Sequence, residues 1–201
     1  MTATTAEAPA SAPRTVALDR ASILEFAEAT SSMHSAYRDA ELPVVPPTYL
    51  CVERFVETTA ASAEDAPIER DCRFFGLPPR AGDRLVMTSR GGDAERLTEF
   101  RDGDGRLVAD AWTQGGSANA TSTAADLLAT YATDWLGPES VRRFRTRSTG
   151  AVPAGESLTC TGEIVQEYVA DGERRVDVVL AAIRPTGQVA ARGWATFARA
   201  D

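Results

Sequence analysis

The chain has 201 residues and a net charge of −8, and all 21 of its basic residues are arginine. An acidic chain without a basic stripe does not suit nucleic acid or an anionic membrane as a partner. The absence of lysine excludes Schiff-base chemistry, pyridoxal attachment and a Walker-type phosphate loop.

The N-terminal stretch MTATTAEAPASAPRTV is rich in Ala, Thr and Pro and lacks the charged and apolar regions of a signal peptide. We predict a disordered tail over residues 1–15. No apolar run approaches the roughly 18 residues of a membrane-spanning helix. The sequence therefore predicts a cytoplasmic protein.

The first half is predicted to contain two helical segments separated by a polar loop. The run ILEFAEAT (23–30) is helix-like and is followed by SSMHSAYRD (31–39), which holds the only histidine, His34. A second helix is expected from Pro46, with an apolar stripe of Tyr49, Val52, Phe55 and Val56. Short strands are expected near 84–90 and 96–102, and DGDG (102–105) predicts a hairpin.

The second half is predicted to repeat this order with longer strands. The run ATSTAADLLATYATDW (120–135) predicts a helix whose apolar stripe is Leu127, Leu128, Tyr131 and Trp135. Alternating or β-branched runs predict consecutive antiparallel strands at 156–169, 174–184 and 188–198. The expected fold class is α+β.

Short internal matches indicate two copies of one unit. PRAGDRL (79–85) matches PAGESL (153–158), and GRLVADAW (105–112) matches GQVAARGW (187–194) in its Gly, Ala and Trp. The order is the same in both halves. We therefore predict an N-terminal domain over 16–115 and a C-terminal domain over 116–201.

The cysteines and the arginine-rich run are not expected to form a metal, cofactor or phosphate site. Cys51, Cys72 and Cys160 stand at no metal-like spacing and are expected to be buried and inert, so we expect neither a metal nor a cofactor. The alternating run RRFRTR (142–147) either binds a phosphate of CoA or phosphopantetheine, or forms an exposed strand face paired with acids. We favour the second interpretation.

These motifs, in this order, resemble the MaoC-like hot-dog family of (R)-specific enoyl-thioester hydratases and 3-hydroxyacyl dehydratases. The features are ILEFAEATSSMHSAYRD, VVPPTYL, PPRAGDRL, DGRLVADAW and the long run from LLATYATDW to CTGEI. The resemblance covers about residues 16–199. It implies a double hot dog, in which one antiparallel sheet wraps two helices.

The family motif A-T-G-D-x-N-P-x-H places an Asp and a His around the water that is added or removed. This chain matches the motif at Ala29 and Thr30. Ser31 stands at the Gly, Ser32 at the Asp, His34 at the Asn and Tyr37 at the His. Both catalytic groups are replaced, and losing one such group typically costs about 10²–10⁴ in rate.

The resemblance therefore implies an acyl-thioester site with altered chemistry. The candidate catalytic residues are His34, Tyr37 and Asp126, the last standing where hot-dog thioesterases carry a carboxylate. The substrate groove is expected between loop 31–48 and the helix N-termini, lined by Ser32, Pro47, Thr48, Tyr49, Thr121 and Ser122.

Three functions remain open at this stage. The first is a repurposed dehydratase or hydratase that carries out elimination, isomerisation or cyclisation on a thioester of CoA or a carrier protein, or on a polyketide-like intermediate of secondary metabolism. The second is a non-catalytic, acyl-chain-binding subunit paired with a catalytic hot-dog protein. The third is a thioesterase that uses Asp126. We expect a monomer or a homodimer, or a heterodimer in the second case.

Overall fold

A computed structural model describes residues 10–32, 34–51, 68–92, 94–115, 123–149, 152–153 and 155–199. The chain begins with β1 (Arg14–Ala17), α1 (Arg20–Ala29), α2 (Ser35–Arg38) and the 3-10 turn η1 (Tyr49–Cys51). Four strands follow: β2 (Ile68–Phe74), β3 (Arg84–Gly91), β4 (Glu95–Arg101) and β5 (Leu107–Gln114). The second half contains α3 (Thr123–Leu136), η2 (Pro138–Ser140), β6 (Val141–Ser148), β7 (Thr159–Ala170), β8 (Glu173–Ile183) and β9 (Val189–Ala198).

All of these strands form one antiparallel sheet in the order β1-β3-β4-β5-β2-β6-β9-β8-β7. The order reads outward in the same way from the β2–β6 junction, so β2, β5, β4 and β3 correspond to β6, β9, β8 and β7. Gly82 and Gly155 lie before the corresponding strands β3 and β7, and both have positive φ, at 90° and 82°. This agreement supports the internal repeat predicted from the sequence.

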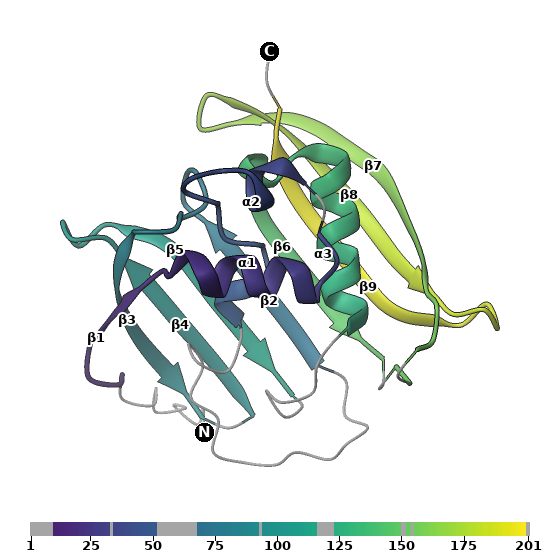
Figure 1. Ribbon diagram of the computed structural model, residues 1–201, viewed down its shortest axis with the longest axis horizontal. Helices are drawn as coiled ribbons and strands as arrows, with labels where there is room; N and C mark the ends of the chain where they lie inside the picture. The colour runs from purple at the N-terminus through teal and green to yellow at the C-terminus, as the bar shows by residue number, and fades with distance from the viewer. Residues whose placement is uncertain are drawn as a thin grey trace, which may run out of the picture.

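The helices lie on one face of this curved sheet, with α1 over the first half and α3 over the second (Figure 1). The core is a continuous apolar cluster between the sheet and the helices. It joins Ile23 of α1, Leu128 of α3, Phe100 of β4, Phe144 of β6 and Phe197 of β9, each at most 1% exposed. A single core extending across both halves holds the overhanging first segment against the second-half helix.

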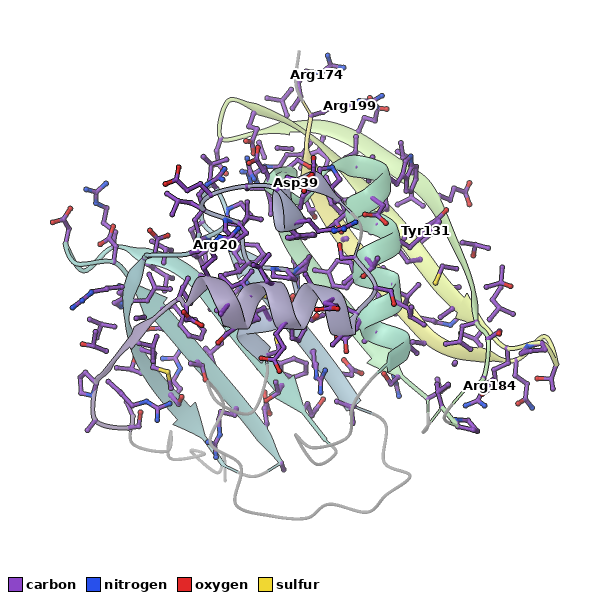
Figure 2. All side chains as sticks on the ribbon, in the orientation of Figure 1. Arg20, Asp39, Tyr131, Arg174, Arg184 and Arg199 are labelled. Carbon is purple, nitrogen blue, oxygen red and sulfur yellow. The ribbon has the colours of Figure 1, made fainter. Side chains whose placement is uncertain are left out.

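Most predicted elements are confirmed, with differences at two helices. The strands of the second half are present, DGDG forms the β4–β5 turn, and the fold is α+β. On α3, however, the predicted core residue Trp135 is 41% exposed. The helix turns its alanines inward. Figure 2 shows Tyr131 on α3. A Cβ added at Gly162 of β7 would lie 2.9 Å from the Trp135 ring and 3.1 Å from the Tyr131 ring. The expected stripe on the helix from Pro46 begins in η1 at Tyr49, and Val52, Phe55 and Val56 lie outside the described residues.

The ends of the chain and the cysteines complete the comparison with the sequence. Arg14 and Thr15 belong to the segment predicted to be a disordered tail, but they form part of β1 and pair with β3. Residues 1–9 of that segment lie outside the described residues. Cys51 and Cys72 are buried, and Cys160 is half-buried. Among the described helices, none combines the length and apolar character needed to cross a bilayer.

Candidate functional site

Residues 31–39, which the resemblance predicts to hold the catalytic groups, start with a sharp turn at the end of α1. The Ser31 N–H donates to the Glu28 carbonyl at 2.9 Å, and the Ser32 N–H donates to the Ala27 carbonyl at 2.8 Å. Ser31 adopts φ 58° to make this Schellman turn, a conformation that favours glycine. The family motif has its Gly at this position. The turn buries the next side chain, Ser32, which is 4% exposed.

The short helix α2 brings Tyr37 inward and keeps His34 at its start. His34 is the N-cap of α2, and its Nδ1 accepts a hydrogen bond from the Ala36 N–H at 3.1 Å. Tyr37 is 1% exposed. Arg20 holds the loop after α2, since its guanidinium donates to the carbonyls of Ala40 and Glu41, next to Asp39 (Figure 2).

Asp126 projects from α3 toward this segment and is buried, at 9% exposed. Its Oδ1 accepts a hydrogen bond from Thr48 Oγ1 at 2.8 Å. Burial raises the pKa of Asp126 above its ordinary value, while the nearby positive charge of Arg70 and the Thr48 hydrogen bond partly offset that rise. A buried carboxyl group whose pKa is raised is a candidate for proton transfer.

These side chains surround one small cavity. Its water-accessible volume is about 10 Å³, which is on the order of what one buried water needs. Its wall consists of residues from α1, α2, the loop before η1 and α3: Phe26, Thr30, Ser32, Tyr37, Pro46, Pro47, Thr48, Asp126, Ala129, Thr130 and Thr133. The cavity is therefore a composite of both halves of the chain.

Two hydroxyl groups at this cavity have no hydrogen-bond partner within the described chain. They are Ser32 Oγ and Tyr37 Oη, which belong to two of the predicted site residues. Burial raises the pKa of Tyr37 well above its usual range, and the nearby Thr133 hydroxyl, which does not reach hydrogen-bonding geometry, offsets only part of that rise. The phenol therefore stays protonated and serves as a hydrogen-bond donor. Together with Asp126 they offer donors and a titratable acceptor to one bound oxygen atom.

The structure brings together five of the nine predicted site residues, namely Ser32, Tyr37, Pro47, Thr48 and Asp126. His34 and Tyr49 are not among the residues that line the cavity, and Tyr49 packs edge-on against Phe26 with ring centroids 5.4 Å apart. Thr121 and Ser122 lie outside the described residues.

Sequence reasoning missed Thr130 and Thr133 of α3. Thr130 Oγ1 donates to the Thr30 carbonyl at 3.0 Å and so ties α3 to the end of α1. The signal that could have found them is the helical spacing of Asp126, Thr130 and Thr133, which places three polar side chains on one face of an otherwise apolar helix.

The arginine-rich run forms β6 and its guanidinium groups pair with acids. Arg143 pairs with Asp71, Arg145 and Arg147 with Glu69, and Arg142 with Glu173. This supports the favoured interpretation of an acid-paired strand.

Comparison with known proteins identifies the architecture. No family model matches the sequence, and no curated protein matches it. Among solved structures, a MaoC-like dehydratase is similar over 97% of this chain and 98% of its own, with a TM-score of 0.72 and 13% identity. A MaoC-like dehydratase from Phytophthora capsici is similar over 96% of this chain and 97% of its own, with a TM-score of 0.60 and 12% identity.

A protein from Mycobacterium tuberculosis that has a double hot-dog fold is similar over 96% of both chains, with a TM-score of 0.60 and 12% identity. The chain has the double hot-dog fold. Within this fold, α3 is the central helix of the second hot dog, and the α1–α2 segment of the first hot dog overhangs it.

The raised pKa of Asp126 predicts a pH-dependent stability. A carboxyl group whose pKa is raised by folding stabilises the protein below its unfolded-state pKa, and this contribution is lost as the pH rises through the folded-state pKa. We expect the wild type to lose stability relative to Asp126→Asn as the pH rises above 3.8, the ordinary value. Urea unfolding of both proteins across this range measures the difference. The control is Asp104→Asn on the β4–β5 turn, and a difference for Asp126→Asn that does not change with pH would contradict the prediction.

The Thr48 hydroxyl is predicted to stabilise the buried carboxylate. Thr48→Val keeps the shape of the side chain and removes the donor, so we expect a loss of about 1–3 kcal/mol in the free energy of unfolding at neutral pH. Thr48→Ser, which keeps the donor, is the matched control. Denaturant unfolding in the Asp126→Asn background should show a smaller loss for Thr48→Val, and an equal loss in both backgrounds would show that the hydrogen bond is not its cause.

Proposed function

We propose that the protein is an acid–base enzyme of the dehydratase and hydratase type, acting on an acyl thioester or a related polyketide-like intermediate in the cytoplasm. The observation that carries this proposal is the position of Asp126. Its buried carboxyl group faces the same water-sized cavity as the unpaired hydroxyls of Ser32 and Tyr37. The names of the structural neighbours, MaoC-like dehydratases, agree with this reaction class.

In the proposed hydration, Asp126 alone carries the proton in both directions. Its carboxylate takes a proton from water as the water oxygen bonds to the β-carbon of the enoyl group. The π electrons move to the α-carbon and the carbonyl, and Asp126 then returns the proton to the α-carbon. Dehydration is the reverse. A carboxyl group with a raised pKa can act as base and acid in turn.

The two hydroxyls hold the oxygen that is added or removed. Tyr37 donates to it and, with its pKa raised, does not compete with Asp126 for the proton. Ser32 both donates and accepts. The cavity accommodates this oxygen and not an acyl chain, so the reacting carbon approaches from its edge. The same proton transfer without water release gives isomerisation, which falls within this proposal.

A second candidate is a non-catalytic acyl-binding subunit that pairs with a catalytic hot-dog protein. It is favoured by the replacement of both family groups at Ser32 and Tyr37 and by the position of His34, which caps α2. A third candidate is a thioesterase in which Asp126 activates water for attack on the thioester carbonyl. The three candidates differ in whether the purified protein alone converts a thioester, and into which product.

The decisive assay follows enoyl- and 3-hydroxyacyl-CoA with the purified protein alone. We expect interconversion of the two thioesters and no release of free thiol. Asp126→Asn is expected to lower the rate about 10²–10⁴-fold. The control is Asp104→Asn on the exposed β4–β5 turn, which should retain wild-type activity.

The other outcomes decide against the proposal. Release of free thiol that depends on Asp126 favours the thioesterase. Turnover only after addition of a co-purifying hot-dog protein favours the subunit. Full activity of Asp126→Asn overturns the assignment of the proton-transferring group.

A further inference from the structure

The face of the sheet that points away from the helices carries a ladder of ion pairs. Along β6, Phe144 points into the core, and Arg143, Arg145 and Arg147 point to the opposite face because side chains alternate along a strand. The neighbouring acids lie on β2 and β5. The ladder is therefore separated from the Asp126 cavity by the sheet itself.

Along the ladder, each of three successive arginines is paired with a different acid. Arg73 pairs with Asp110, Arg143 with Asp71 and Arg145 with Glu69, with N–O distances of 2.9, 2.9 and 2.8 Å. Arg145 lies directly opposite Asp71 in the β2–β6 register yet pairs with Glu69. Each of these β6 arginines thus pairs with the next acid along β2 and not with the residue directly opposite. As a result, the end of the ladder has more arginines than carboxylates.

At the end of the ladder, two arginines share one carboxylate and a third arginine has none within the described chain. Arg147 reaches Glu69, already bonded to Arg145, at 3.4 Å. Arg192 of β9 lies directly opposite Arg147, and no ion pair joins it to any residue of the described chain. Arg145 Nε is also buried without a hydrogen-bond partner among those residues. Two positive charges are therefore in excess at this point of a chain whose net charge is −8.

This end of the ladder borders a hollow of about 370 Å³, lined by Glu69, Arg143, Arg145, Arg147 and Trp194. Trp194 is 43% exposed and lies directly opposite Arg145 on β9. A larger neighbouring hollow contains Arg73, Arg142, Arg143 and Arg175, and each of these has a carboxylate partner. In the smaller hollow, by contrast, Arg145 and Arg147 share the single carboxylate of Glu69, and Arg192 lies directly opposite Arg147 on the neighbouring strand.

Like charges directly opposite each other on adjacent strands destabilise a sheet, and a buried unpaired donor has a cost of its own. An anion bound between Arg147 and Arg192 removes the first of these costs. Arginine recognises phosphate oxygens through paired N–H groups, and two excess charges match a phosphate monoester. The volume exceeds what a phosphate fills, and Trp194 provides a flat apolar wall for a ring.

We propose that this hollow binds a phosphate monoester attached to a planar ring, with the ring against Trp194 and the phosphate at the edge of the hollow, where Arg192 of β9 lies directly opposite Arg147. The site is independent of the proposed reaction, because it lies on the other face of the sheet.

The test is calorimetric titration of the full chain with adenosine monophosphate. We expect binding that is tighter than that of adenosine or inorganic phosphate. Arg192→Gln and Arg147→Gln should each weaken it roughly tenfold or more. Arg106→Gln removes an equal charge from the exposed β4–β5 turn and should leave it unchanged.

A second readout is the melting temperature without ligand. Because Arg192→Gln relieves the repulsion with Arg147, we expect a rise of about 1 °C. Adenosine monophosphate should then raise the melting temperature of the wild type and of Arg106→Gln, but not that of Arg192→Gln. The proposal is overturned if the wild type responds no more to adenosine monophosphate than to sulfate at equal ionic strength. It is also overturned if Arg192→Gln still binds as the wild type does.

Discussion

The pairing of β2 with β6 is the constraint on which the rest of the structure depends. Six residue pairs, from Ile68–Ser148 to Arg73–Arg143, join the two hot dogs into one sheet. Their inward side chains share a single core, so α3 is held at a fixed position relative to the α1–α2 segment. The cavity exists only because of this junction, since Ser32, Tyr37 and Thr48 come from one half and Asp126 and Thr130 from the other. The ion-pair ladder on the opposite face is built on the same junction.

Asp126 illustrates how the fold maintains a group that is costly to bury. A carboxyl group inside a protein is tolerated when hydrogen bonds and opposite charge compensate for lost water. Here the compensation is the Thr48 hydroxyl and the charge of Arg70, and it is incomplete, because the pKa of Asp126 remains raised. The overhanging segment shows a related cost at Ser31, which occupies a left-handed conformation that glycine adopts more readily. Both features fall at the predicted site, although Asp171 between β7 and β8 also has a positive φ, at 54°.

Local patterns in the sequence predicted the strands well, and long-range contacts explain what they missed. Alternation and turn residues located β7, β8 and β9 because these signals act over a few residues. Trp135 was assigned to the core from its helical spacing, but the neighbouring glycine of β7 lets its ring lie at the rim. The sequence also identified Ser32, Tyr37 and Asp126 as candidates, yet not that they meet. Thr48 and Asp126 are 78 residues apart, and only the β2–β6 junction brings them within 2.8 Å.

The central claim is that groups from both hot dogs act as one site, in which Asp126 carries the proton and Tyr37 donates a hydrogen bond to the oxygen. A double-mutant cycle on the rate of enoyl-thioester hydration, with Tyr37→Phe, Asp126→Asn and the combination, tests it most directly. Residues that act as a unit give strongly non-additive losses. The account predicts that the double variant is about as impaired as Asp126→Asn alone. Losses that multiply, or a rate that neither substitution changes, would contradict it.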